Sequence, residues 1–409
     1  MSKPNVFFLA IDSLRADVVF GDQVSTPNID AFGSRGAAFH QCVCTTTTTT
    51  PSFSSMFTGC YPPRHGVRGL QGHRLASSVT TMAEAFAGAG YKTHAEVTGP
   101  LLPETGVLRG FEEANHRQAY RVPFFGWRDE IVSRMRTLVE PWFMLLHIWE
   151  VHRPYRSPPN FEKRRDRTGY EAAVAATDEY LGPVFEAAGD NALVVITGDH
   201  GEEYPDSEMG LKMIRWARRL RKGLALGKWF PYLDTKLAEH EIGHGFALYE
   251  HLVRVPLVIA GPGVPPTTVE EQVRHVDLFP TLADLCGVPI PAGIDGRSLL
   301  PLFEGRSLSE EPAYLEAVGV KLEGNRIVGV RTPDWKLLKR GGAKPALYKL
   351  DGGTPPDEKR NLYRRYPEVA RRLEGVLEQI ASTEAKAESG MTADEEAVVE
   401  KHLRDLGYL

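Results

Sequence analysis

Val6-Phe7-Phe8-Leu9-Ala10-Ile11 is an unbroken apolar run that the carboxylate of Asp12 follows directly. Runs of the same kind recur at residues 142–148, 193–197 and 255–260, and the segments between them have helical patterns. Continuous hydrophobicity, unlike an alternating pattern, is typical of strands that helices cover on both faces. The sequence therefore predicts an α/β fold in which a large, mostly parallel sheet is sandwiched by helices.

Ionisable side chains stand at the ends of these apolar runs. Asp12 follows the first run, His152 lies just past the second, and Asp199 and His200 follow the third. The carboxyl ends of parallel strands meet at one edge of a sheet, and open α/β sheets bind their ligands there. We therefore expect these four side chains to gather at one site.

Length and charge narrow the class of protein. The 409 residues suffice for one large domain and a smaller one. A net charge of −5 gives no basis for a nucleic-acid partner. No apolar run is long enough to cross a bilayer, and the first run is too short for a signal peptide, which predicts a cytoplasmic protein. The sequence contains no feature that fixes the oligomeric state.

The last quarter of the chain has a different pattern. Residues 327–331, 335–338 and 346–350 have the character of short antiparallel strands, and helical segments follow them to the end of the chain. We therefore divide the chain into a catalytic α/β domain, residues 1–305, and a small α+β subdomain with a short antiparallel sheet and a helical tail, residues 306–409.

Five motifs follow one another along the chain. They are Asp12-Ser13-Leu14-Arg15-Ala16-Asp17, Thr26-Pro27-Asn28-Ile29-Asp30, Thr49-Thr50-Pro51-Ser52, Thr197-Gly198-Asp199-His200-Gly201-Glu202, and residues 249–257. In this order they resemble the sulfatase-like branch of the alkaline phosphatase superfamily, and the resemblance covers nearly the whole chain. It implies a metal-dependent enzyme that acts on sulfate or phosphate esters.

The third motif departs from the pattern of sulfatases. In the sulfatase signature a Cys that is converted to formylglycine opens the motif, whereas here the opening residue is Thr49, and Phe53 replaces an Arg. Thr cannot become formylglycine, so the resemblance implies a metal-activated hydroxyl nucleophile, as in the phosphodiesterase and phosphoethanolamine-transferase branches. The Thr run at residues 45–50 leaves the register open by one residue, and Pro51 favours Thr49 over Thr48. A polar, Thr-rich loop without catalytic function is the alternative.

A Thr hydroxyl is a weak nucleophile at neutral pH and needs a divalent cation. The candidate ligands beside Thr49 are Asp12, Asp199 and His200, although an Asp-His-Gly sequence is by itself also a common turn. Sulfatases usually carry a second Asp and an Asn where this chain has Ser13 and His200. A nitrogen ligand with few carboxylates favours manganese or zinc, with calcium and magnesium as the alternatives.

Three further histidines are candidates for the substrate side of the site. His152 resembles the histidine of a P-H-x-P-Y element, and His240 and His244 stand where relatives carry a His. They could protonate the leaving group, bind a non-bridging oxygen or complete a second metal site, which the sequence leaves open. A solvated or core position is the alternative for His240 and His244.

Residues 204–239 read as an insertion between two catalytic segments. Within it, residues 211–230 interleave basic and apolar side chains in the manner of an amphipathic helix. We expect a lid over the site or a peripheral contact with an anionic membrane. A helix that packs its apolar face on the domain is the alternative.

The leading functional hypothesis is a metal-dependent hydrolase of phosphoric esters, either phosphodiesters or phosphonate monoesters, that passes through a phospho-Thr49 intermediate. Transfer to an alcohol, and hence a phosphotransferase, follows from the same chemistry. The expected substrate is a small-molecule, lipid or glycan phosphate ester. The alternatives are a sulfuric ester hydrolase and a non-catalytic anion-binding protein.

Overall fold

The computed structural model describes residues 3–118, 122–158, 161, 169–203, 216, 244–318, 326–350, 358, 360–383, 390–406 and 408. His240 and nearly all of the 204–239 insertion, which includes the predicted basic helix, lie outside the described residues. Of that insertion the structure describes Trp216, whose side chain is exposed.

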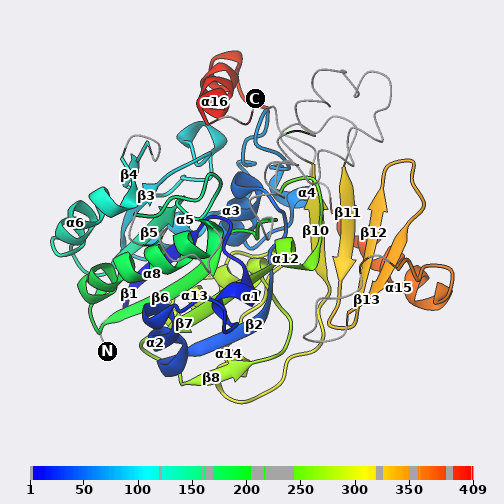
Figure 1. Ribbon diagram of the computed structural model, residues 1–409, viewed down its shortest axis with the longest axis horizontal. Helices are drawn as coiled ribbons and strands as arrows, with labels where there is room; N and C mark the ends of the chain where they lie inside the picture. The colour runs from blue at the N-terminus through cyan, green and yellow to red at the C-terminus, as the bar shows by residue number, and fades with distance from the viewer. Residues whose placement is uncertain are drawn as a thin grey trace.

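A nine-stranded sheet forms the centre of the molecule, in the order β4-β3-β5-β1-β6-β7-β2-β8, with β9 paired to β2 (Figure 1). Among the described strands β7 alone runs against the others, since it is antiparallel to both β6 and β2. The strands are β1 (Asn5–Ile11), β2 (Ala37–Val43), β3 (Lys92–Val97), β4 (Glu113–His116), β5 (Trp142–Ile148), β6 (Ala192–Gly198), β7 (Arg254–Ala260), β8 (Thr267–Val269) and β9 (Val273–Arg274). The predicted, mostly parallel sheet is confirmed.

Two apolar layers sandwich this sheet because side chains of a strand alternate between its faces. Phe8 of β1 lies in one layer and Phe7 in the other. The first layer packs on α3 (Thr49–Thr58), α5 (Met82–Gly88), α13 (Leu278–Cys286) and α14 (Leu300–Phe303). The second packs on α1 (Ala16–Val19), α2 (Pro27–Arg35), α6 (Phe124–Met135) and α8 (Gly169–Ala188). Shorter elements are α4 (Pro62–His65), α12 (Glu250–Val253), η1 (Pro103–Thr105) and η2 (His275–Asp277).

A second, four-stranded antiparallel sheet stands beside the first, as Figure 1 shows on the right. Its strands are β10 (Ala313–Ala317), β11 (Ile327–Arg331), β12 (Trp335–Arg340) and β13 (Ala346–Lys349). The helix α15 (Pro367–Ala381) packs Leu373 and Leu377 on Val330 and Leu337 of this sheet. The predicted short antiparallel sheet is therefore confirmed, whereas the boundary at residues 305 and 306 stays a prediction.

The last described helix, α16 (Ala393–Asp405), follows the second sheet in sequence but packs on the first domain. A capping box starts it, since the Thr392 hydroxyl accepts from the backbone of Glu395 and the Glu395 carboxylate accepts from that of Thr392. Val399 and Leu403 bury their side chains against Leu70 and Leu102. In Figure 1, α16 lies at the top, close to the end of the chain.

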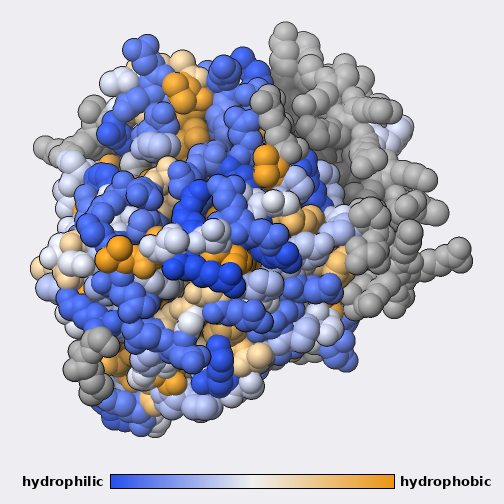
Figure 2. Space-filling model, turned by 90° about the vertical axis from the view of Figure 1, so that its left-hand side faces the viewer, coloured by the Kyte–Doolittle hydropathy of each residue, from blue (hydrophilic) through white to orange (hydrophobic). Residues whose placement is uncertain are grey.

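None of the described helices has both the length and the apolar character that a bilayer crossing requires. Figure 2 shows one face of the molecule, on which hydrophobic residues lie in separate patches among polar and charged ones.

Candidate active site

The edge of the sheet brings the predicted acidic residues together. Because β1 lies between β5 and β6, the residues that follow β1 and β6 are neighbours. The backbone N–H of Ser13 donates to Asp199 Oδ1 at 3.0 Å, and the Ser13 hydroxyl donates to Asp12 Oδ1 at 2.8 Å. Ser13 adopts a φ of +64°, in the left-handed region, where this tight turn between the two carboxylates is made. Asp12, Asp199 and His200 are fully buried.

Thr49 is the first residue of α3, and its hydroxyl points at this edge. Thr49 Oγ1 lies 3.3 Å from Asp12 Oδ2 and 3.4 Å from His200 Nε2. Two other hydroxyls of the Thr run bind elsewhere: Thr47 donates to the carbonyl of Ala247, and Thr50 to that of Pro100. Within the Thr run, the structure therefore directs Thr49 towards Asp12 and His200.

His147 joins this cluster, although the sequence analysis did not single it out. It lies within β5, paired with Ala10 of β1, and its side chain is fully buried. Its Nδ1 lies 3.1 Å from the hydroxyl and 3.2 Å from the carbonyl of Thr98, and that hydroxyl donates to the carbonyl of His147. Because a carbonyl only accepts, we place the proton on Nδ1, which leaves the lone pair of Nε2 facing Asp12 Oδ2 at 3.7 Å. The one feature of the sequence that could have pointed to His147 is its place as a histidine inside the otherwise apolar run at residues 142–148.

Asp12, His147 and Asp199 form a donor set that fits a divalent cation. Each offers a ligand atom within 4.8 Å of the others, and His200 Nε2 is 3.4 Å from Asp199 Oδ2. Asp199 Oδ2 and His147 Nε2 are buried without a hydrogen-bond partner, which is costly in a protein interior. Burial and the nearby Asp199 carboxylate raise the pKa of Asp12 well above its usual value. A cation would supply the positive charge that these carboxylates lack.

A second donor set adjoins the first and consists of His152, Glu202 and His244. His244 Nδ1 lies 3.7 Å from Glu202 Oε2, and neither atom has a hydrogen-bond partner. Burial raises the pKa of Glu202 to about 8, although Arg153 acts in the opposite direction. The rings of His200 and His244 are 4.4 Å apart, so the two sets meet there. Glu202 ends a motif noted in the sequence, but its place among candidate metal ligands was not predicted.

Phe53, which stands where the sulfatase signature has an Arg, makes an apolar contact at this site. Phe53 is fully buried, and its ring meets that of His147 edge-on at 5.1 Å. Two other arginines near the signature are paired with carboxylates, Arg64 with Asp295 and Arg68 with Glu316.

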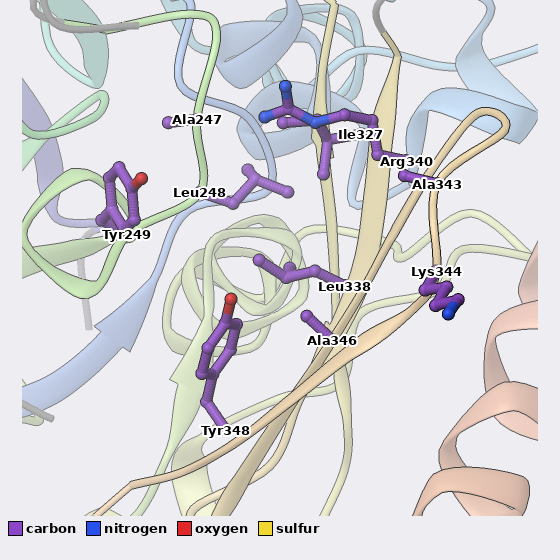
Figure 3. A pocket seen from close by; sticks show the side chains of 10 residues that line it. All are labelled: Ala247, Leu248, Tyr249, Ile327, Leu338, Arg340, Ala343, Lys344, Ala346 and Tyr348. Carbon is purple, nitrogen blue, oxygen red and sulfur yellow. The ribbon is translucent and has the colours of Figure 1, made fainter. Parts of the chain in front are cut away.

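A separate pocket lies between residues 247–249 and the second sheet, with a volume of about 210 Å³. Figure 3 shows Tyr249 and Tyr348 on one side of it and Arg340 and Lys344 on the other. No member of the two donor sets lines this pocket.

Comparison with known proteins relates the chain to sulfatases. Residues 4–288 match the family described as Sulfatase, and residues 239–383 match the family described as N-sulphoglucosamine sulphohydrolase, C-terminal. The "Uncharacterized sulfatase YidJ" of Escherichia coli (strain K12) is 24% identical over 440 residues, which cover 92% of this chain and 87% of that protein. Arylsulfatase K of Danio rerio is 30% identical over 233 residues, which cover 54% of this chain and 38% of that protein. The chain thus spans little more than a third of arylsulfatase K.

Solved structures of the same fold include both sulfatases and a phosphonate monoester hydrolase. BT1596, a 2-O GAG sulfatase, superposes with a TM-score of 0.72 at 21% identity and 96% coverage of both chains. The phosphonate monoester hydrolase of Agrobacterium radiobacter superposes with a TM-score of 0.71 at 18% identity, covering 94% of this chain and 96% of that one. The fold is therefore common to enzymes of both ester classes.

Proposed function

This chain belongs to the sulfatase family, and from that premise we propose that it is a metal-dependent hydrolase of phosphoric esters that uses Thr49 as its nucleophile. The coarser statement, an ester hydrolase for phosphoric or sulfuric esters, follows from the family and its relatives. The narrower proposal names phosphodiesters or phosphonate monoesters as the substrates. These would be esters of a small molecule, a lipid or a glycan.

The observation that carries the proposal is the hydroxyl of Thr49, which opens the motif that resembles the sulfatase signature and lies 3.3 Å from Asp12 Oδ2 and 3.4 Å from His200 Nε2. A formylglycine hydrate releases sulfate by elimination, because its carbon bears a second hydroxyl. The corresponding carbon of Thr49 bears none. Turnover therefore requires that water attack the covalent intermediate, which is feasible at phosphorus.

The metal would be held by Asp12, Asp199 and His200, with His147 facing the same place. When bound, a divalent cation would lower the pKa of the nucleophilic hydroxyl and polarise the ester oxygen. Two nitrogen donors beside two carboxylates favour manganese or zinc over calcium or magnesium.

The residues of the chain account for each bond and proton. Thr49 Oγ1 forms a bond to phosphorus and gives its proton to Asp12, while the bond from phosphorus to the leaving oxygen breaks. Burial lowers the pKa of His244 well below its usual value and raises that of Glu202 to about 8. We therefore assign protonation of the leaving oxygen to His244, which takes up the proton of Glu202 at Nδ1, 3.7 Å from Glu202 Oε2. Water then attacks phosphorus and gives a proton through His244 back to Glu202, while the Thr49 oxygen departs with the proton returned by Asp12. An alcohol in place of that water would give a phosphotransferase.

His152, Glu202 and His244 also suit a second cation, since they combine two nitrogen donors with one carboxylate. In that case the second cation would replace His244 as the group that stabilises the leaving oxygen. Metal content per chain distinguishes the two assignments.

A sulfuric ester hydrolase remains the second candidate because the relatives are named sulfatases. A non-catalytic anion-binding protein is the third candidate, and the intact donor sets weigh against it. The test is a panel of aryl phosphodiesters, aryl phosphonates and aryl sulfates with identical leaving groups. We expect the phosphorus esters to be hydrolysed at least about 100-fold faster than the sulfates, which corresponds to roughly 3 kcal/mol of transition-state discrimination. Multiple turnovers of an aryl sulfate at the rate of the best phosphorus ester would contradict the proposal.

A further inference from the structure

Tyr408 lies against His152, 256 residues away in sequence, and its hydroxyl is 2.9 Å from His152 Nε2. We propose that Tyr408 occupies this nitrogen until a ligand replaces it, so that α16 and Tyr408 form a movable wall of the active site. The inference rests on the proposed function, in which His152 serves the substrate side of the site. It extends that function to the last described helix, which lies beyond the residues that match the two family models.

Both ring nitrogens of His152 are engaged. Nδ1 lies 2.7 Å from the carbonyl oxygen of Arg153, and a carbonyl only accepts, so Nδ1 carries the proton. Nε2 therefore holds the lone pair and accepts from the Tyr408 hydroxyl. Trp149 stacks on the ring at 4.5 Å and His244 meets it at 4.9 Å. The ring is thus held on its faces and at both nitrogens.

Nε2 is also the atom that the second donor set needs from His152, since the backbone holds Nδ1. A ring nitrogen has one lone pair, which either accepts from a hydroxyl or binds a cation or a substrate group. Binding of Tyr408 and binding of a ligand at His152 Nε2 therefore exclude each other.

The segment that carries Tyr408 is docked by apolar, polar and ring contacts, the last between His402 and His116 and between Tyr408 and His244. The Tyr408 N–H donates to the carbonyl of Leu403, which folds the residue back onto α16. The helix is fixed by its apolar contacts with Leu70 and Leu102 and by His402 Nε2, 2.9 Å from the carbonyl of Gly99. An exposed ion pair joins Arg74 to Glu395. Exposed ion pairs contribute little, so the docking rests mainly on one small apolar cluster.

The docking point is connected to the first donor set. Gly99 lies between Thr98, whose carbonyl accepts from His147, and Pro100, whose carbonyl accepts from Thr50. The carbonyls of Thr98, Gly99 and Pro100 thus accept hydrogen bonds from β5, α16 and α3, respectively.

The test is a calorimetric titration of the metal-free full-length protein with Mn²⁺, and separately with Zn²⁺. Tyr408→Phe keeps the ring but removes the hydroxyl that competes for His152 Nε2. We expect the second equivalent of metal to bind Tyr408→Phe about tenfold tighter than the wild type, because the free energy of one neutral hydrogen bond no longer opposes binding. The affinity of the first equivalent should not change. Leu403→Ala, which weakens the docking of α16, should shift the second equivalent in the same direction.

The matched control is Tyr363→Phe, because the Tyr363 hydroxyl binds Glu374 of α15 instead of a site residue. The inference would be overturned if the second equivalent of metal bound Tyr408→Phe no more tightly than the wild type, or if neither protein bound a second equivalent. The titration needs no turnover, so the two proposals are separable. If phosphorus esters are not hydrolysed but Tyr408→Phe still binds the second metal more tightly, the proposed function fails and the role of Tyr408 stands.

Discussion

The hydroxyl of Thr49 stands at the meeting point of side chains that are far apart in sequence. Asp12 and His200 contact it, and His147 and Asp199 lie behind them. Burying two carboxylates this close together is unfavourable without a positive partner. The arrangement is therefore better explained by ion binding than by stability of the fold.

Replacing a single ligand should release the metal. Mutating a residue that only hydrogen-bonds to a metal ligand lowers metal affinity roughly 10- to 100-fold. Because Asp199 is itself a proposed ligand, we expect Asp199→Asn to lower metal affinity by more than this and to lower activity in parallel. Metal content of the purified variant, measured by mass spectrometry, checks this. Asp178→Asn is the matched control, because Asp178 is also buried but accepts from the backbone of Asn28 and Ile29. Full metal content in Asp199→Asn would refute the donor set.

The sequence motifs singled out Asp12, Thr49, Asp199 and His200 as candidates. Asp12, Asp199 and His200 follow apolar runs, and Thr49 opens the motif that resembles the sulfatase signature. His147 escaped notice because a histidine inside a buried strand is usually satisfied by its core. Its role depends on β5 lying next to β1, and strand order is a tertiary property that apolar runs do not encode. His240 and the basic insertion lie outside the described residues and stay predictions.

At the level of elements, a buried ion cluster fastens the second sheet to the first domain. Glu250 of α12 accepts from Arg331 of β11 at 2.9 Å and from Lys336 of β12 at 3.0 Å. Lys336 also donates to the carbonyl of Leu248 and pairs with Glu358. Burial alone would raise the pKa of Glu250, but Lys336 and Arg331 together hold it well below its usual value.

Glu250→Gln should destabilise the protein by about 3–5 kcal/mol, because it removes the carboxylate that the buried cations Arg331 and Lys336 share and leaves Lys336 with Glu358. A lowered folded-state pKa stabilises at pH values above the unfolded value, about 4.3, and this contribution is lost as pH falls through the folded-state pKa. The difference between wild type and variant, measured by urea unfolding, should therefore shrink below about pH 4. Glu378→Gln, at an exposed carboxylate, should change the free energy of unfolding by less than about 0.5 kcal/mol. A Glu250→Gln protein as stable as the wild type at pH 7 would contradict this role.

The sequence predicted the elements better than their arrangement. The apolar runs match β1, β5, β6 and β7 within a residue or two, because fully buried strands need continuous apolar side chains. The reversed direction of β7 was not predicted, since hydrophobicity carries no information on strand polarity.

On the scale of the whole molecule, the site draws on most of the chain. Its residues run from Asp12 to His244, and Tyr408 reaches it from the far end. The motifs predicted the family because they occur in order, and the structure adds the return of α16 to the first domain. That return was not predicted from the sequence, because Val399 and Leu403 form an ordinary amphipathic pattern that fits any apolar partner.

The central claim is that a phosphoric ester is cleaved through a covalent bond to Thr49. The most direct test is to mix the metal-loaded enzyme with phenyl p-nitrophenyl phosphate, to stop the reaction with acid within the first turnovers, and to locate the adduct by peptide mass spectrometry. The account predicts a phenylphosphoryl group on Thr49 in the wild type, retention of an adduct in Thr49→Ser, and its absence in Thr49→Ala together with a loss of activity on the order of a thousandfold. Product release without any adduct on the enzyme, or an adduct on Thr48, would contradict it.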